Sequence, residues 1–125
     1  MTPEQLKARS TRFALEVIAL VRTLPRTLLA EIIAGQMVRS GTSTGATYRA
    51  ACRARSRAEF VAKMGVAEEE ADETLYWLEL LLETHLAESG TVQRLITEAT
   101  DLVAILSAGR KTARRAVKAG KTGKR

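Results

Sequence analysis

The sequence has few of the residues that mark several protein classes. Its 125 residues include one cysteine, one histidine, two prolines and five aromatic residues. Because Cys52 has no second cysteine to pair with, an intrachain disulfide framework and the usual zinc clusters are excluded, and we expect a free, buried thiol in a reducing compartment. No run approaches the roughly 18 uninterrupted apolar residues of a membrane span, and Met1 to Gln5 do not resemble a signal peptide. We therefore expect a cytoplasmic protein that does not associate with a membrane.

Histidine is too rare for the catalytic sites that helical proteins commonly carry. A di-iron bundle needs paired Glu-x-x-His motifs, but Leu82 and Leu81 stand three and four residues before His85, the only histidine. Cys52 or Ser43 as a nucleophile would need an activating base, and one histidine does not easily complete a triad. We expect no enzymatic activity, no metal and no cofactor, and we expect His85 to interact with a helix end.

The composition is helical, because Ala, Leu, Glu and Arg dominate and no stretch alternates as a strand does. Apolar residues recur at three- and four-residue steps in four segments, and Thr2 and Ser56 begin two capping-box patterns. The expected helices cover residues 2–24, 26–55, 56–82 and 92–106, the last continuing to about residue 118. All three connections are short, which favours antiparallel neighbours. The sequence therefore predicts an all-α, up-down-up-down four-helix bundle.

The second expected helix has an unusual middle of small residues, Ser40 to Thr47. Glycine inside a helix costs about 1 kcal/mol relative to alanine, so local propensity favours a loop that would split the helix in two. The pattern on both sides nevertheless keeps helical phase, and we expect a continuous helix that a neighbour approaches closely along one small-residue face. That face comprises Ser40, Ser43, Thr47, Ala50 and Ala54.

The net charge of +6 is unevenly distributed along the chain. Residues 1–57 sum to +7, residues 58–88 to −8 and residues 89–109 to −1, whereas the last sixteen residues carry +8 and no acid. We therefore divide the chain into a slightly acidic bundle domain, residues 1–109, and a basic helix end and tail, residues 110–125.

Nucleic-acid binding is the function that the basic groups favour. The predicted contacts are Arg49, Arg53, Arg55, Arg57, Arg110, Lys111, Arg114, Arg115 and Lys118. Five aromatic residues are too few for extensive base stacking, so contacts should go to the RNA or DNA backbone. In the alternative interpretation, the helix arginines pair with the acidic stretch Glu68 to Glu73, within or between subunits.

The end of the third expected helix is more apolar than one buried face requires. In residues 75–82 only Glu79 is charged, so apolar side chains surround most of the helix. Such a helix is buried on more than one side, and another subunit is the simplest second partner. The predicted oligomer interface comprises Leu75, Tyr76, Trp77, Leu80 and Leu81.

Three stretches in the middle of the chain carry a family resemblance. They are residues 39–51 (RSGTSTGATYRAA), 54–63 (ARSRAEFVAK) and 69–81 (EEADETLYWLELL). In this order and spacing they resemble the bacterial four-helix bundle proteins named after the 23S ribosomal RNA intervening sequences in which they were first encoded. The resemblance extends over roughly residues 6 to 106. The family name records a gene location and is not evidence of ribosome binding.

The resemblance implies a homo-oligomeric ring, usually a pentamer, of antiparallel four-helix subunits without known enzymatic activity. A related branch, the accessory variability proteins of diversity-generating retroelements, implies nucleic acid and a reverse transcriptase as partners. Two functions therefore stay open. The first is a non-enzymatic oligomer that binds nucleic acid, and the second is a protein-interaction scaffold whose arginines serve assembly.

Overall fold

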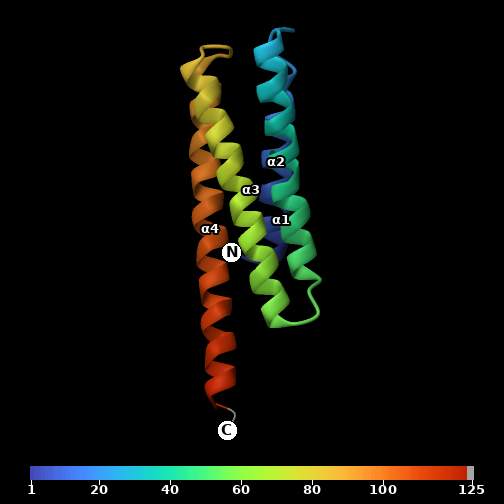
Figure 1. Cartoon of the computed structure of the whole chain (residues 1–125), viewed down its shortest axis with the longest axis vertical. Helices are drawn as coiled ribbons and strands as arrows, with labels where there is room; N and C mark the ends of the chain where they lie inside the picture. Colours follow the sequence, from blue (N-terminus) through green and yellow to red (C-terminus); the bar gives the residue numbers. More distant parts are fainter. Residues whose placement is uncertain (124–125) are drawn as a thin grey trace.

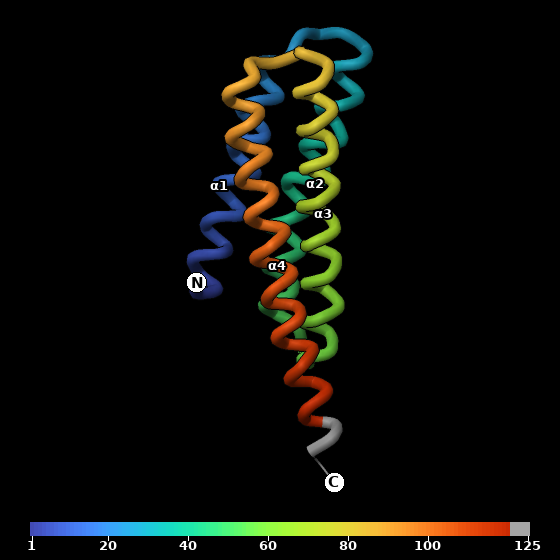
Figure 2. Tube along the Cα trace, turned by 90° about the vertical axis from the view of Figure 1, so that its left-hand side faces the viewer, coloured from blue at the N-terminus to red at the C-terminus, as the bar shows by residue number. Residues whose placement is uncertain are grey.

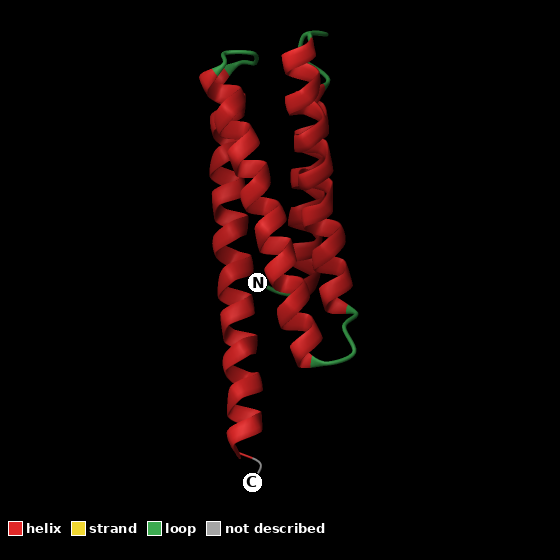
Figure 3. Cartoon of the chain, viewed as in Figure 1, coloured by secondary structure: helices red, strands yellow, loops and turns green. Residues whose placement is uncertain are grey.

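The computed structural model describes residues 1–123, with side chains to residue 120, and this part of the chain forms only helices and loops (Figure 3). The four helices are α1 (Pro3–Val21), α2 (Leu28–Cys52), α3 (Arg57–Glu83) and α4 (Ser89–Gly123). The predicted all-α class and the four helices are therefore confirmed. Two expected ends differ. The first helix stops at Val21 rather than near Leu24, and α4 remains helical past Gly120.

Each helix packs against its neighbours in sequence, and α4 closes the set by packing against α1 (Figures 1 and 2). The diagonal pairs, α1 with α3 and α2 with α4, do not pack against each other among the described residues. Figure 1 shows the α1–α2 and α3–α4 loops at one end of the bundle and the α2–α3 loop at the other. Since α4 has 35 residues and α1 only 19, the last turns of α4 project beyond the other helices (Figure 2).

Polar side chains fix the helix starts, as the sequence predicts for two of them. The Thr2 hydroxyl accepts the Gln5 N–H at 3.1 Å, and the Gln5 side chain accepts the Thr2 N–H at 2.8 Å, which completes a capping box. At α3 the Ser56 hydroxyl accepts the Glu59 N–H at 3.0 Å. The Glu59 carboxylate, however, accepts the Arg55 N–H instead of completing the box. Two hydrogen bonds therefore tie the last residues of the α2–α3 loop to the first turn of α3.

The core consists of large apolar side chains from all four helices, spaced by three or four residues along each. Its largest fully buried apolar members are Phe13, Val17, Met37, Leu78, Leu81, Val92, Leu95, Leu102 and Leu106.

The small-residue stretch of α2 is continuous helix, which excludes the loop alternative, and it lets α1 approach closely. A Cβ added at Gly41 would lie 3.3 Å from the Val17 methyl groups, and one at Gly45 would lie 3.0 Å from the Ser10 hydroxyl. The buried face is displaced from the predicted one, because it includes Gly41, Thr44 and Gly45 together with Ser40, whereas Ser43 and Thr47 are only half-buried. Glycine thus provides the close approach between α1 and α2.

Candidate nucleic-acid interface

All four helices contribute to a hollow of about 680 Å³ at the end of the bundle that holds the α2–α3 loop. The start of α1, the end of α2, the start of α3 and the basic part of α4 each supply lining residues. Its lining comprises Pro3, Glu4, Lys7, Tyr48, Ala51, Cys52, Ala54, Arg55, Ser56, Arg57, Phe60 and Ala113. Because Ala113 lines the same hollow as Arg55 and Arg57, the basic part of α4 lies beside the arginine-rich loop.

The predicted cations therefore gather at one end of the molecule, although they come from two separate stretches of sequence. We call this group the basic end. It comprises Arg49, Arg53, Arg55, Arg57, Lys111, Arg114, Arg115 and Lys118, all of them exposed. Arg53 caps the C-terminus of α2, and Arg57 is the first residue of α3. Two further basic residues of the tail, Lys124 and Arg125, lie outside the described residues.

Seven of the eight cations of the basic end have no acidic partner among the residues that the structure describes. Among the residues that the structure describes, Arg49, Arg53, Arg55 and Arg57 form no ion pair, and neither do Lys111, Arg114 and Arg115. The acidic stretch of α3 pairs with other cations. Arg39 lies 2.5 Å from Glu73 and 3.3 Å from Glu70. Pairing of the arginine cluster with Glu68 to Glu73 inside one subunit is therefore wrong.

Arg110 is the exception among the predicted nucleic-acid contacts. Its Nε donates to Glu68 Oε1 at 2.8 Å, and its side chain is only 19% exposed. This ion pair joins α3 to α4, so the structure assigns Arg110 to helix packing and we leave it out of the basic end.

The hollow itself contains one acid, one buried phenol and one thiol. The carboxylate of Glu4 is exposed at its edge. Burial, and then the hydrogen bond between Tyr48 and the Cys52 thiol, raise the pKa of Tyr48 well above its ordinary value, so the phenol stays neutral at physiological pH. Cys52 is a free thiol, but it is half-buried rather than buried as expected.

The predicted oligomer interface is only partly on the surface. Tyr76 is 53% exposed, and Leu75, Trp77 and Leu80 are half-buried. Leu81 is fully buried in the core of its own subunit, so its assignment to an interface is wrong. Since the helix is apolar nearly all round, composition alone could not separate Leu80 from Leu81.

The start of α2 exposes a second apolar group that sequence reasoning assigned only to the helix pattern. Leu28, Leu29 and Ile32 are all at least half exposed. Figure 1 places the start of α2 at the same end of the bundle as the end of α3. Their exposure could have been predicted from the three consecutive apolar residues Leu28 to Ala30. A helix with one buried face has apolar residues at three- and four-residue steps, so three in a row leave some of them exposed.

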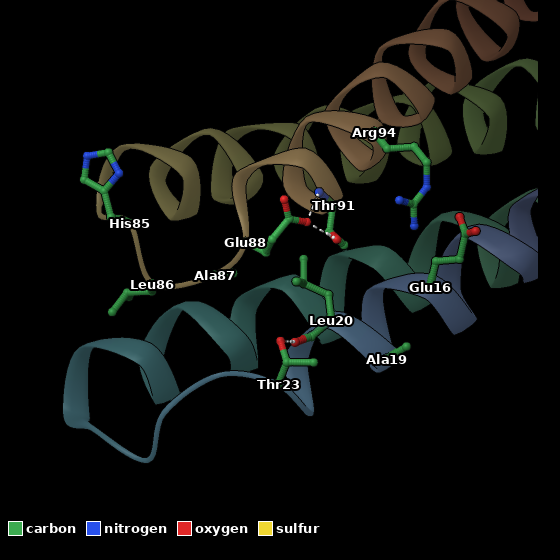
Figure 4. A pocket seen from close by; sticks show the side chains of 10 residues that line it. All are labelled: Glu16, Ala19, Leu20, Thr23, His85, Leu86, Ala87, Glu88, Thr91 and Arg94. Carbon is green, nitrogen blue, oxygen red and sulfur yellow. Dashed lines mark hydrogen bonds between the residues drawn. The ribbon is translucent and has the colours of Figure 1, made fainter.

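The opposite end of the bundle has its own hollow, of about 610 Å³, beside the α3–α4 loop (Figure 4). Glu88 is already engaged there, because it accepts the N–H groups of Gly90 and Thr91 at 2.8 Å each and the Thr91 hydroxyl at 2.6 Å. The Thr91 hydroxyl makes the largest contribution to lowering the pKa of Glu88. The carboxylate therefore caps α4 and is not free to bind a ligand.

His85 lies at the outer edge of this second hollow, away from the Glu88 carboxylate (Figure 4). It has a φ of 56° and follows the C-cap residue Thr84, in the left-handed position that commonly ends a helix. Its backbone N–H bonds to the Leu82 carbonyl. The structure therefore places His85 at a helix end, where the sequence predicted it.

Neither a metal-binding cluster nor a membrane-spanning helix is found in the part of the chain that the structure describes. No three His, Cys, Asp or Glu side chains gather there in a way that could hold a metal ion. Within the same residues, no helix combines the length and the apolar character needed to cross a membrane.

Comparison with known proteins gives one family. The model of a family described as 23S rRNA-intervening sequence protein matches residues 5–108. A solved structure of a protein of unknown function from the S23 ribosomal protein family of Bacteroides thetaiotaomicron is 34% identical, with a TM-score of 0.81 over 89% of this chain and 99% of that one. No curated protein matches the chain. Neither description names a reaction.

Proposed function

The chain belongs to the 23S rRNA-intervening sequence protein family, and we propose that it is a non-enzymatic homo-oligomer that binds the backbone of RNA or DNA through its basic end. In this proposal each subunit is an antiparallel, up-down-up-down bundle, and the subunits form a ring, a pentamer as the resemblance implies. The ring acts in the cytoplasm and needs no cofactor.

One observation carries the proposal: seven cations from two stretches of sequence lie at one end of the bundle and form no ion pair within the described residues. Unpaired cations on one surface attract phosphates and release the counterions that surround nucleic acid. Six of the seven are arginine, whose guanidinium can contact a phosphate through two N–H groups at once. A ring repeats this surface in every subunit, which strengthens binding to a long strand.

A second function is favoured by the exposed apolar side chains of α2 and α3. Leu28, Leu29, Ile32 and Tyr76 are 50% to 77% exposed. Exposed apolar groups of this kind mark surfaces that bind protein. In this alternative the protein is an interaction scaffold, such as an accessory subunit for a reverse transcriptase, and its arginines serve subunit assembly.

The proposal is tested by binding of a fluorescent 30-nucleotide strand to two variants that lose equal charge. The basic-end variant carries Arg49→Gln, Arg53→Gln, Arg114→Gln and Arg115→Gln. The control variant carries Arg12→Gln, Arg22→Gln, Arg26→Gln and Arg94→Gln, which are exposed residues outside the basic end.

Fluorescence anisotropy at low salt should show at least about tenfold weaker binding for the basic-end variant and a change of less than about threefold for the control. Equal weakening of both variants contradicts a localised interface. Undetectable binding by the unmodified protein at low salt contradicts nucleic-acid binding and leaves the scaffold function.

A further inference from the structure

The hollow at the basic end combines an apolar interior with a cationic edge. Its volume of about 680 Å³ falls within the range of about 300 to 1,000 Å³ that is usual for small-molecule sites. Pro3, Ala51, Ala54 and Ala113 contribute apolar surface from α1, α2, the α2–α3 loop and α4. A purely electrostatic backbone contact does not need such a lining, so the hollow calls for a ligand that also has an apolar part.

Phe60 supplies the aromatic surface of the hollow. It lies in the first turns of α3 and is half-buried, whereas Tyr48 is only 5% exposed. Phe60 is therefore the aromatic residue with surface left for contact. Stacking on an aromatic side chain suits every base, because each base has a π-face.

Three cations line the same hollow as this aromatic residue. Lys7 comes from α1, Arg55 from the loop and Arg57 from α3, and none of them forms an ion pair within the described residues. Glu4 is the single acid of the lining. The edge therefore has three cations and one anion, which suits a ligand with a phosphate.

We propose that the hollow binds one unstacked nucleotide of a single strand, with its base against Phe60 and its phosphate at Arg55, Arg57 and Lys7. This inference rests on the proposed function and specifies its ligand, because the bases of a duplex are paired and stacked and cannot enter without being extruded. The surrounding basic end binds both forms of nucleic acid through their backbones, and the hollow gives the single strand an additional contact.

The only cysteine of the chain makes the test direct, because Cys52 lines the hollow. The rate of Cys52 alkylation by a small maleimide is measured on the full chain, alone and with a saturating 20-nucleotide single strand, a duplex of the same sequence, or adenosine monophosphate. The single strand should slow alkylation at least about fivefold, and the duplex should change it less than twofold. Equal protection by strand and duplex contradicts the inference. The mononucleotide presents the same base and phosphate without the backbone contacts of the basic end, so it should protect Cys52 only at a much higher concentration than the strand.

The variant Phe60→Leu provides the second measurement, since it keeps an apolar side chain but removes the ring. It should weaken single-strand binding by about fivefold or more, within the range known for loss of one stacked base, and leave duplex binding within twofold. Lys63→Gln, on the next turn of α3 and outside the lining, is the control. If the unmodified protein binds both probes and Phe60→Leu binds the single strand equally well, the inference about the hollow is wrong but the proposed function is not. Absence of binding to either probe overturns the proposed function as well.

Discussion

The hydroxyl groups of Ser40 and Thr74 lie 2.8 Å apart in the interior of the bundle, where neither residue has exposed surface. The Ser40 hydroxyl also donates to the Gln36 carbonyl at 2.9 Å. This hydrogen bond joins the small-residue stretch of α2 to the middle of α3. Because each buried hydrogen bond adds to stability, we expect the two residues to be energetically coupled, although each hydroxyl also has a carbonyl of its own helix within reach.

Replacing Thr74 with valine should lower the free energy of unfolding by about 1 kcal/mol, since Ser40 loses a buried donor while the side-chain shape is kept. Thr100→Val is the control, because Thr100 is exposed and bonds only to the Ile96 carbonyl of its own helix. Urea unfolding measures both. If the double variant Ser40→Ala, Thr74→Val loses the full sum of the two single changes, the residues are not coupled.

Gly45 and Gly35 should respond in opposite directions to alanine. Alanine at Gly35 meets no atom within 4 Å, so it should stabilise the protein by about 0.5 to 1 kcal/mol through helix propensity. At Gly45 the added Cβ lies 3.0 Å from the Ser10 hydroxyl, and overpacking typically costs about 1 to 3 kcal/mol. Gly45→Ala should therefore destabilise the protein in thermal unfolding. Equal stabilisation by both changes contradicts the close approach of α1 and α2.

Arg110 and Arg114 carry the same charge four residues apart, but they should have separable effects. Arg110→Gln breaks the ion pair with Glu68 and should lower stability by up to about 1 kcal/mol while leaving nucleic-acid binding within twofold. Arg114→Gln should leave stability unchanged and weaken binding. Urea unfolding and anisotropy on both variants check this, and equal binding losses would place Arg110 in the interface after all.

The ion pair of Glu73 should be visible in the fluorescence of Trp77, the only tryptophan of the chain. The Arg39 guanidinium, followed by the Trp77 indole N–H, lowers the pKa of Glu73 below its ordinary value of 4.5. Because the folded-state pKa is the lower one, the pair stabilises the protein above the ordinary pKa and is lost as the pH falls through the folded value.

Trp77 emission should therefore change with a midpoint below pH 4.5, and Glu73→Gln should abolish that change. The stability difference between Glu73→Gln and the unmodified protein should also shrink as the pH falls. A midpoint at or above 4.5 contradicts the pairing.

The helices could be predicted because their signals are local. Thr2 and Ser56 cap where the sequence indicates, and the apolar spacing on both sides of Gly41 and Gly45 outweighs the cost of glycine inside a helix. Such signals involve residues a few positions apart, so they can be read without knowing how the helices pack.

The partners of the acidic stretch could not be predicted in the same way. Arg39 reaches Glu70 and Glu73 because of the relative position of α2 and α3 along the bundle axis, and periodicity does not determine that position. The same limit applies to the hollow, since Lys7, Phe60 and Ala113 meet only through the packing of separate helices. The sequence therefore predicted the cations of the basic end but not their common location.

The salt dependence of nucleic-acid binding tests the central claim most directly. Affinity for a duplex falls with salt with a logarithmic slope of about 0.9 per phosphate contact. The basic-end variant should show a slope shallower by about 2 to 4 than that of the unmodified protein, whereas the control variant with Arg12, Arg22, Arg26 and Arg94 replaced should keep the original slope. Equal slopes for the unmodified protein and the basic-end variant would contradict the account.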